Sequence, residues 1–291
     1  MQLTVFTPTY NRRELLTRAY ASLKEQSCKD FEWVIVDDGS TDDTRDYVEA
    51  WIQEGLVEIR YYYQENGGKM RAHNRGAEYA SAPLFVCLDS DDYLVPDGVK
   101  LLLDAWEEGI KKSNDSDKIA GIVAHKGKSE NELLGECDFP FGGETTLYGL
   151  YTAGFKGETT LLFRTDVLRE YPFPEIDGEK YVPEDYIYDK IDQEYRLLIL
   201  PKVITVCEIV SEGYTDSVRA LKRNNITAWY LYYEQRAFIT SPSVLKWKYA
   251  GYYAIYAKRA GKKIFSGSRI PKFWLITGLA GAAILLITGK E

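Results

Sequence analysis

Apolar and polar stretches alternate regularly along the first hundred residues. Four short, mostly apolar runs are typical of strands buried on both faces. These runs are residues 3–7, 31–37, 57–64 and 84–88. The longer stretches between them predict helices that end near residues 26, 51 and 80, the first two capped by Asn11 and by Ser40 or Thr41. This order predicts an α/β fold with a Rossmann-like, mostly parallel sheet and helices on both faces.

The middle of the chain has a less regular pattern. We expect helices at 96–109, 165–171, 184–195 and 225–239, and β segments at 119–126, 159–164 and 197–210. Residues 127–143 read as a loop because they combine glycine, proline and acidic residues.

Polar residues follow each of the four N-terminal strands. Ligands bind at the carboxyl ends of strands in open α/β sheets. A single acidic turn is usually a solvated loop, but four polar clusters at one edge indicate a ligand site. The clusters are Thr7-Pro8-Thr9-Tyr10-Asn11, Asp37-Asp38-Gly39-Ser40, Glu65-Asn66-Gly67-Gly68-Lys69 and Asp89-Ser90-Asp91-Asp92.

The acidic cluster of residues 89–92 indicates a metal site. Neighbouring carboxylates repel one another unless a cation lies among them, and Mg²⁺ binds one or two carboxylates together with substrate phosphates. We expect Asp91 to bind the metal directly, and Asp89 to lie nearer a ribose or to act through water. The alternative is a group of acids that favours a helix N-terminus, a role that suits Asp92.

The motifs TVFTPTYNR, VIVDDGSTDDT, QENGGKMRAHNRG and LFVCLDSDDYLVPDG, in this order, resemble the nucleotide-sugar half of family-two glycosyltransferases with the GT-A fold. The resemblance covers the first 100 residues and continues more loosely to about residue 235. It implies a nucleotide-sugar-binding half at 1–100 and an acceptor-binding half of the same domain at 101–240. Residues 241–291 would form a membrane-associated tail.

The resemblance also implies roles for individual donor-side residues. Thr7 and the Pro8 backbone would lie beside the base. Asp38 would accept a hydrogen bond from N3–H of uracil, which favours a UDP-sugar, while Asp37 would orient the loop. The implied donor-binding set is Thr7, Pro8, Tyr10, Asp38, Asn66, Lys69, Arg71, Asp89 and Ser90, with Asp91 and Asp89 for the metal. His73 replaces an arginine common in this segment, and we expect a structural role for it.

The catalytic base is expected in the second half. The segment FPEIDGEKYVPEDYIYDKI resembles bacterial surface-polysaccharide glycosyltransferases, in which a carboxylate deprotonates the acceptor hydroxyl. We favour Asp185 and keep Glu184 as the alternative, and both would be ordinary first-turn helix acids if neither is the base. Glu158 is a weaker acceptor-contact candidate. Residues 212–216 resemble a loop that closes over the site.

The formal net charge of −8 is divided unevenly. Eight Lys and Arg and no acidic residue lie in 243–272, so residues 1–242 carry −16, which argues against nucleic acid as a partner. The next 17 residues, 273–289, are uncharged and span about 26 Å as a helix, against about 30 Å for a bilayer core. Three interpretations remain open: an in-plane or re-entrant membrane segment, a single span, or a soluble hairpin or oligomer contact. The basic neck predicts the cytoplasmic face of the cell membrane, with peripheral or single-anchor attachment.

Together these features predict an inverting, metal-dependent glycosyltransferase of the hexosyltransferase type, with Mg²⁺ or Mn²⁺. It would move a sugar from a UDP-sugar to a hydroxyl of a lipid-linked glycan in cell-surface polysaccharide synthesis. The alternatives are a sugar nucleotidyltransferase, whose Gly-rich first loop is absent from this sequence, and an inactive membrane-recruited scaffold. The sequence leaves the sugar, the acceptor and the oligomeric state open.

Overall fold

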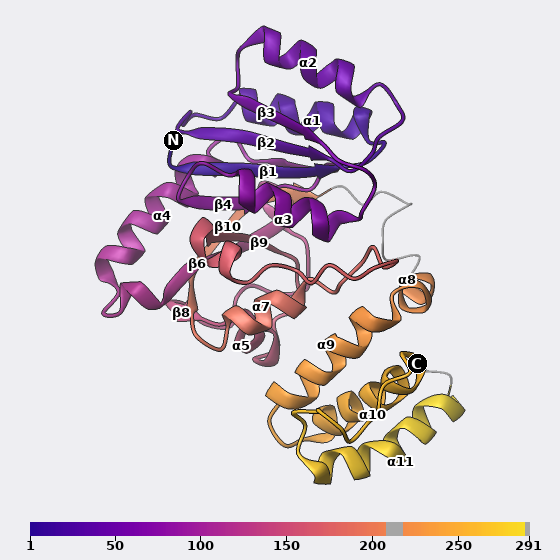
Figure 1. The fold of residues 1–291 in the computed structure, drawn as a ribbon. Coiled ribbons are helices and arrows are strands. Elements are labelled where there is room, and N and C mark those ends of the chain that lie inside the picture. The colour runs from indigo at the N-terminus through magenta and orange to yellow at the C-terminus, as the bar shows by residue number, and fades with distance from the viewer. Residues whose placement is uncertain (208–217, 289–291) are drawn as a thin grey trace. The chain divides into compact units, whose positions relative to one another are not determined.

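The computed structural model describes residues 1–207 and 218–288 (Figure 1). The predicted β stretch 208–210 and the predicted closing loop 212–216 lie outside the described residues. Every other strand and helix predicted above is present, with ends shifted by a few residues. The expected loop at 127–143 is wrong at its start, because a strand continues to Ser129 and a short strand follows at Glu132–Leu133.

The strands described form one mixed sheet in the order β3-β2-β1-β4-β9-β6-β10-β5, with β7 on β6 and β8 on β10. Their bounds are β1 Leu3–Thr9, β2 Phe31–Asp37, β3 Ile59–Tyr63, β4 Leu84–Cys87, β5 Asp92–Leu94, β6 Ile119–Ser129, β7 Glu132–Leu133, β8 Glu144–Thr145, β9 Thr159–Arg164 and β10 Arg196–Cys207. The four N-terminal strands pair in parallel, as predicted. In the second half only β6 and β10 are parallel, and β9 and β5 pair antiparallel with their neighbours.

The helices described are α1 Arg13–Lys24, α2 Thr44–Glu54, α3 Lys69–Tyr79, α4 Gly98–Lys112, α5 Leu147–Thr152, α6 Thr165–Glu170, α7 Asp185–Ile191, α8 Val218–Asn224, α9 Ile226–Ile239, α10 Val244–Arg259 and α11 Lys272–Thr288, with a 3₁₀ turn at Ser116–Lys118. In the N-terminal half, α1 and α2 lie on one side of the sheet and α3 on the other (Figure 1).

Alternate residues of the buried strands supply these two faces. Leu3 and Val5 on β1 pack with Leu16 of α1 and Val48 of α2 in the main hydrophobic core. Phe6 points to the opposite face and stacks on Phe85. On that face α3 lies so close that a Cβ on Gly76 would come within 2.3 Å of the Phe6 ring. The expected covering of both faces by helices is therefore confirmed.

The predicted helix caps are wrong. Asn11 adopts a positive φ of 51° and precedes α1 by two residues, and the Arg12 side chain at the N-cap makes no capping hydrogen bond. The Oδ1 of Asn11 instead accepts a hydrogen bond from the Thr41 amide at 2.7 Å. In α2 the Asp42 side chain, rather than Ser40 or Thr41, accepts from the Thr44 amide. Asn11 therefore joins two loops instead of starting a helix.

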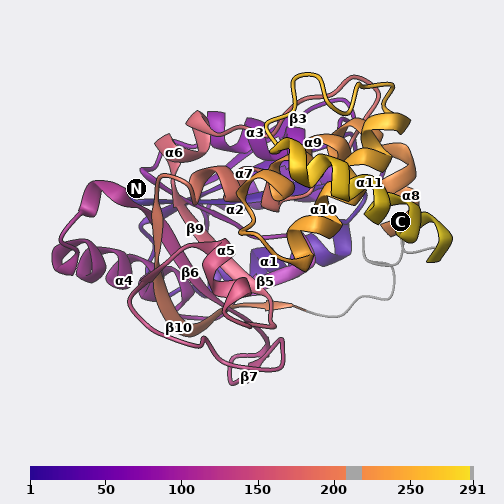
Figure 2. The same cartoon turned by 90° about the horizontal axis from the view of Figure 1, so that it is seen from below.

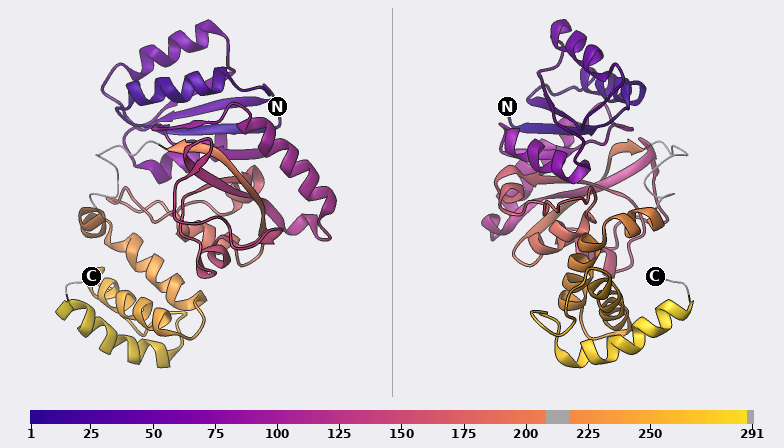
Figure 3. Two further views of the ribbon diagram at one scale, coloured as in Figure 1. Left: turned by 180° about the vertical axis from the view of Figure 1, so that it is seen from behind. Right: turned by 45° about the vertical axis from the view of Figure 1, so that its right-hand side comes forward.

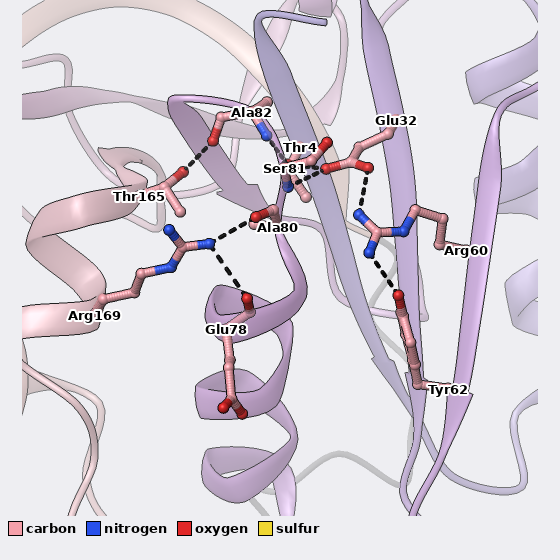
Figure 4. A network of polar contacts seen from close by, with 10 residues as sticks. All are labelled: Thr4, Glu32, Arg60, Tyr62, Glu78, Ala80, Ser81, Ala82, Thr165 and Arg169. Carbon is pink, nitrogen blue, oxygen red and sulfur yellow. Dashed lines mark hydrogen bonds and ion pairs between the residues drawn. The ribbon is translucent and has the colours of Figure 1, made fainter.

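A buried carboxylate ties the amino ends of the strands together (Figure 4). Glu32 on β2 accepts hydrogen bonds from the Thr4 hydroxyl at 2.7 Å and the Ser81 amide at 2.6 Å, and from Arg60 at 3.0 Å. In the same network Arg169 donates to the Ala80 carbonyl at 2.7 Å. Burial opposes the charged form of Glu32, but these donors hold the pKa of its carboxyl below its ordinary value.

The chain divides into two compact units. The first unit comprises residues 1–173 and the described residues from 187 to 207, and it contains the whole sheet. The second unit comprises residues 174–186 and 218–288. The predicted division at residues 100 and 240 concerns which ligand each part binds, and it stays a prediction.

In the second unit, α10 packs against both α9 and α11 (Figures 2 and 3). The core of this unit consists mainly of aromatic and small side chains, with Tyr233, Tyr253 and Tyr256 buried among alanines. Small residues bring α10 and α11 close together, since a Cβ on Gly278 would lie 2.7 Å from Cβ of Ala250. Within the described residues, no helix is long and apolar enough to cross a bilayer.

Candidate active site

The four polar clusters lie at one edge of the first unit, and side chains connect them. Because β1 to β4 are parallel, their carboxyl ends share an edge. The loop after β1 contacts the loop after β2 through Asn11 and Thr41. Asp38 contacts the loop after β3, and Lys69 at the start of α3 contacts Asp89 after β4. The expectation that these clusters gather is confirmed.

The two aspartates after β2 organise the loops. Asp37 accepts a hydrogen bond from the Ser40 amide at 2.7 Å and from the Tyr61 hydroxyl at 2.6 Å. Asp38 accepts from the amides of Gly67 and Gly68, both at 2.8 Å, and from Gln64 at 2.6 Å. The loop-orienting role assigned to Asp37 therefore extends to Asp38. Its Oδ2 accepts one of these bonds and retains the capacity for a second.

The loops after β2 and β3 touch at Gly39 and Asn66. Gly39 has a φ of +90°, and a Cβ there would lie 2.9 Å from the Asn66 nitrogen, so only glycine suits this position. The Asn66 side chain donates to the Asp38 carbonyl at 2.8 Å. Asn66 therefore connects the two loops and is half-buried.

Thr7 is expected to lie beside the base together with the Pro8 backbone, and this stays a prediction. Thr7 is fully buried, and its hydroxyl accepts a hydrogen bond from Trp33 Nε1 at 2.9 Å. Its neighbour Pro8 is also buried, whereas Tyr10 is 48% exposed. At this strand end, Tyr10 is the aromatic ring that reaches solvent.

Asp89 is held between two lysines. Lys69 Nζ lies 2.8 Å from Oδ1 of Asp89, and Lys126 Nζ lies 3.7 Å from its Oδ2. Burial opposes the charged form, but the two lysines hold the pKa of Asp89 well below its ordinary value. Asp89 is therefore held in place by two cations, and its expected role beside a metal stays a prediction.

Lys126 was missed by the sequence interpretation. It ends the apolar part of β6 and reaches back to Asp92, with 2.6 Å between Nζ and Oδ2. Asp92 is 1% exposed, and burial raises its pKa while Lys126 opposes the shift. Burial also raises the pKa of the Cys207 thiol, beside Asp92, to about 12. The sequence offered one signal for this pairing, a lysine directly after the apolar residues of a predicted strand. A buried lysine there needs a carboxylate partner.

Asp91 has a partly exposed carboxylate in this cluster. Its side chain is 31% exposed, and Arg12 lies 3.8 Å from its Oδ2. Among the described residues, no three His, Cys, Asp or Glu side chains gather around one point. The donor set here is therefore one or two carboxylates, which fits a hard divalent cation whose remaining ligands are substrate oxygens and water.

The other donor-side residues lie near these loops. Ser90 is half-buried in the turn that the Asp92 amide closes on the Asp89 carbonyl at 3.0 Å. Arg71 is half-buried in the first turn of α3, and its Cδ would lie 2.8 Å from a Cβ on Gly67. His73 is buried against Phe6 and other aromatic rings. Its packing supports the expected structural role.

In the second unit Asp185 begins α7 and pairs with Arg236 of α9. Arg236 Nη2 donates to Asp185 Oδ2 at 2.7 Å, and the Asp185 side chain remains 51% exposed. Partial burial raises the pKa of Asp185, with Glu184 adding to the shift and Arg236 opposing it. The carboxylate is therefore held in one orientation, open to solvent and more basic than an ordinary aspartate.

The segment that carries Asp185 is hydrogen-bonded to α9. Glu179 accepts from the amides of Thr227 at 2.7 Å and Ala228 at 2.8 Å, in the first turn of the helix. Asn225 accepts from the amides of Lys180 and Tyr181. These bonds hold residues 179–181 beside α9, which explains why 174–186 belongs to the second unit. Glu184 is half-buried next to Asp185.

Glu158 lies in the first unit immediately before β9. Its carbonyl accepts from the Lys126 amide at 3.1 Å, and its side chain is exposed. The backbone thus places Glu158 beside Lys126, although the glutamate stays a weaker acceptor-contact candidate.

Comparison with known proteins gives the family. The model for glycosyl transferase family 2 matches residues 4–171, more than half of the chain. The chain belongs to glycosyl transferase family 2. The matched range contains the whole connected edge, from Thr7 to Asp92, and Lys126 and Glu158.

Characterised members of the family share parts of this sequence. Validoxylamine A glucosyltransferase of Streptomyces hygroscopicus is 44% identical over 107 residues, which are 35% of this chain and 25% of that protein. GalNAc(5)-diNAcBac-PP-undecaprenol beta-1,3-glucosyltransferase of Campylobacter jejuni is 29% identical over 186 residues, 60% of this chain and 55% of that protein. The chain thus spans between a quarter and about half of these two relatives.

Solved structures of this family-2 member's fold cover nearly the whole chain. TarS of S. aureus, residues 1–349 with UDP-GlcNAc, has a TM-score of 0.64 at 22% identity, over 92% of this chain and 74% of that one. The mannosyltransferase PcManGT of Pyrobaculum calidifontis, with GDP-Man and Mn²⁺, has a TM-score of 0.54 at 19% identity, over 98% and 75%. The fold is the α/β GT-A fold that the sequence resemblance implies.

Proposed function

We propose that this family-2 glycosyltransferase transfers a sugar from a UDP-sugar to a hydroxyl of a lipid-linked glycan, in surface polysaccharide synthesis. The observation that carries the proposal is the connected edge of the first unit. Asp38, Lys69, Asp89 and Asp91 lie on three linked strand ends there, and Arg12, after the fourth strand β1, contacts Asp91. TarS was solved with UDP-GlcNAc, and the Campylobacter relative is named for a polyprenyl-linked acceptor, which supports both halves of the proposal.

On the donor side, the chain's own residues bind and orient. The remaining acceptor capacity of Asp38 Oδ2 suits an imide N–H, as in uracil. Lys69 offers a cation beside Asp89 for diphosphate oxygens.

Asp91 would hold Mg²⁺ or Mn²⁺, with Asp89 supporting it from the lysine-bound side. A divalent cation bound there would offset the negative charge that develops on the departing diphosphate.

On the acceptor side, Asp185 would act as the general base. The acceptor O–H proton moves to the Asp185 carboxylate while the acceptor oxygen bonds to the anomeric carbon. The bond from that carbon to the β-phosphate oxygen breaks, and UDP leaves with the electron pair. Attack from the face opposite UDP inverts the anomeric centre. A raised pKa favours this role, because a base works best when its pKa approaches the operating pH.

The basic neck, which has no acidic residue from 243 to 272, supports a place at the cytoplasmic face of the membrane. There the enzyme would meet a lipid-linked acceptor without leaving the cytoplasm.

The test is calorimetry of UDP binding with and without Mn²⁺, followed by measurement of UDP release from a panel of UDP-sugars with a polyprenyl-linked glycan. We expect metal-dependent UDP binding and acceptor-stimulated release. Asp91→Ala should lower turnover at least about 100-fold, whereas the control Asp97→Ala, on the N-cap of α4, should not. Absence of UDP binding, or full turnover of Asp91→Ala, would contradict the proposal. Binding without turnover would instead favour the scaffold alternative.

A further inference from the structure

Helix α11 is apolar on the face it buries and on the face it exposes. Leu275, Gly278, Ala282 and Leu285 lie on the buried side. The exposed side carries Phe273, Ile276, Leu279, Leu286 and Ile287, with exposed fractions of 66, 61, 40, 52 and 84%. A soluble surface helix normally has a polar outer face, and a helix apolar all round lies in a protein core or in lipid. Contiguous exposed apolar patches of this kind mark interaction sites.

A cationic pocket adjoins this exposed face. Three lysines, Lys258 at the end of α10 with Lys262 and Lys263 after it, line a cavity of about 540 Å³ together with Ile264, Phe265 and Leu279. Leu279 belongs to both features, so the pocket opens onto the exposed side of α11. Within the described residues, none of these lysines forms an ion pair with a carboxylate.

This combination matches an anionic amphiphile. The apolar wall made by Ile264, Phe265 and Leu279 suits hydrocarbon, and three unpaired ammonium groups suit a phosphate. Burial of the α11 face against a second copy of this chain would bring two such lysine clusters together, and their repulsion disfavours that occupant. A lipid surface satisfies the apolar face and the lysines at the same time.

We propose that the exposed face of α11 and the pocket of Lys258, Lys262 and Lys263 form a lipid-docking site. Anionic phospholipid in a bilayer is its ligand, with the lipid phosphate held by the lysines. The apolar side chains of α11 enter the acyl boundary, and α11 lies in the membrane plane. This inference deepens the proposed place at the membrane and rests on it, because it names the residues and the lipid chemistry.

Co-sedimentation of the full chain with vesicles tests the site. Vesicles of phosphatidylcholine alone are compared with vesicles that also contain phosphatidylglycerol. We expect binding that depends on phosphatidylglycerol and falls about 100-fold in Lys258→Gln/Lys262→Gln/Lys263→Gln, at about fivefold for each lysine. The control is Lys100→Gln/Lys111→Gln/Lys112→Gln, which removes three exposed lysines from α4 of the first unit and should bind as wild type does.

A second pair of variants tests the apolar face. Ile276→Ser/Ile287→Ser should lose vesicle binding, whereas Ile52→Ser/Leu56→Ser, at exposed apolar positions in or next to α2, should keep it. All four sites are exposed, so the fold should survive, and a thermal melt checks this. Vesicle binding equal to wild type in both the triple lysine variant and Ile276→Ser/Ile287→Ser would overturn the site. A wild-type dimer that Ile276→Ser/Ile287→Ser makes monomeric, without vesicle binding, would overturn it in favour of self-association.

Calorimetry with UDP separates this inference from the proposed enzymatic function. Loss of vesicle binding in the lysine variant, with its UDP affinity intact, supports the docking site. Wild-type protein that binds UDP but no phosphatidylglycerol vesicle overturns the docking site and leaves the transferase proposal standing. Wild-type protein that binds vesicles but no UDP supports the docking site and contradicts the transferase proposal.

Discussion

The two compact units of this chain differ in the interactions that stabilise each one internally. The first unit buries charged groups and gives each at least one fixed partner, as at Glu32, Asp38 and Asp92. The second unit has a core of tyrosines and small residues, and the rings of Tyr233 and Tyr252 stack with centroids 4.7 Å apart.

The difference follows from what each unit must face. A buried charge is costly unless its partners are fixed, so it specifies a single loop geometry, which a donor site needs. A core of tyrosines buries no charge, although its hydroxyl groups still favour hydrogen-bond partners. The second unit leaves the apolar side of α11 exposed, and this is the side that we propose docks on lipid.

The largest effect is expected from an exposed charge in the second unit. Asp185→Asn should keep the contact with Arg236 and the melting temperature, but should lower kcat by about 10²- to 10⁴-fold, because the amide cannot accept the acceptor proton. Steady-state UDP release measures this. Glu184→Gln should cost much less, and the reverse ranking would make Glu184 the base.

Arg236 offers a sharper test of the same assignment. It opposes the rise in the pKa of Asp185, so Arg236→Met should raise that pKa further and move the acid limb of the kcat profile to higher pH. A kcat profile whose acid limb stays in place would separate Asp185 from the rate-determining proton transfer.

The next effect tests the buried charges of the first unit. Lys126→Met leaves Asp89 and Asp92 without their shared cation, and we expect a loss of about 3–5 kcal/mol in the free energy of unfolding. UDP affinity should fall with it. Urea denaturation measures the stability, and Lys126→Met/Asp92→Asn should recover part of it by removing one charge. No recovery would mean that Lys126 acts through packing alone.

A smaller, pH-dependent effect is expected at Glu32. Because the folded state lowers its pKa, the ionised form contributes stability above the unfolded pKa of about 4.3, and this is lost as the pH falls toward the folded value. Glu32→Gln should cost about 1.5–3 kcal/mol at neutral pH, and less in acid. Denaturation curves at several pH values measure the stability difference between Glu32→Gln and wild type, with Glu130→Gln at an exposed site as the control. A stability difference that does not change with pH would contradict this prediction.

The smallest effect is expected at His73. The ring packs edge-on against Phe6, Phe85 and Phe173, so His73→Phe should cost less than about 1.5 kcal/mol and leave turnover near wild type. A large loss of kcat with an unchanged melting temperature would give this histidine a functional role.

The sequence was most informative where local pattern and tertiary environment agree. The sequence pattern predicted the bounds of β2 and β9 to the residue. The run in β2 is mostly apolar because that strand is buried on both faces. The four polar clusters were predicted to gather, because parallel strands put their carboxyl ends on one edge. The caps failed because Asn11 and Ser40 bond each other's loops, which no local pattern records.

The sequence by itself determined the α/β order, the family motifs, the position of Asp185 at a helix start and the basic neck. Only the tertiary structure decided which groups pair. In the folded chain Trp33 donates a hydrogen bond to Thr7, and Arg236 pairs with Asp185. Lys126 lies between Asp89 and Asp92. The physical reason is that strand and helix periodicity is a local property, written within a few residues. A buried ion pair joins residues tens of positions apart, and its geometry exists only once the sheet and helices have packed.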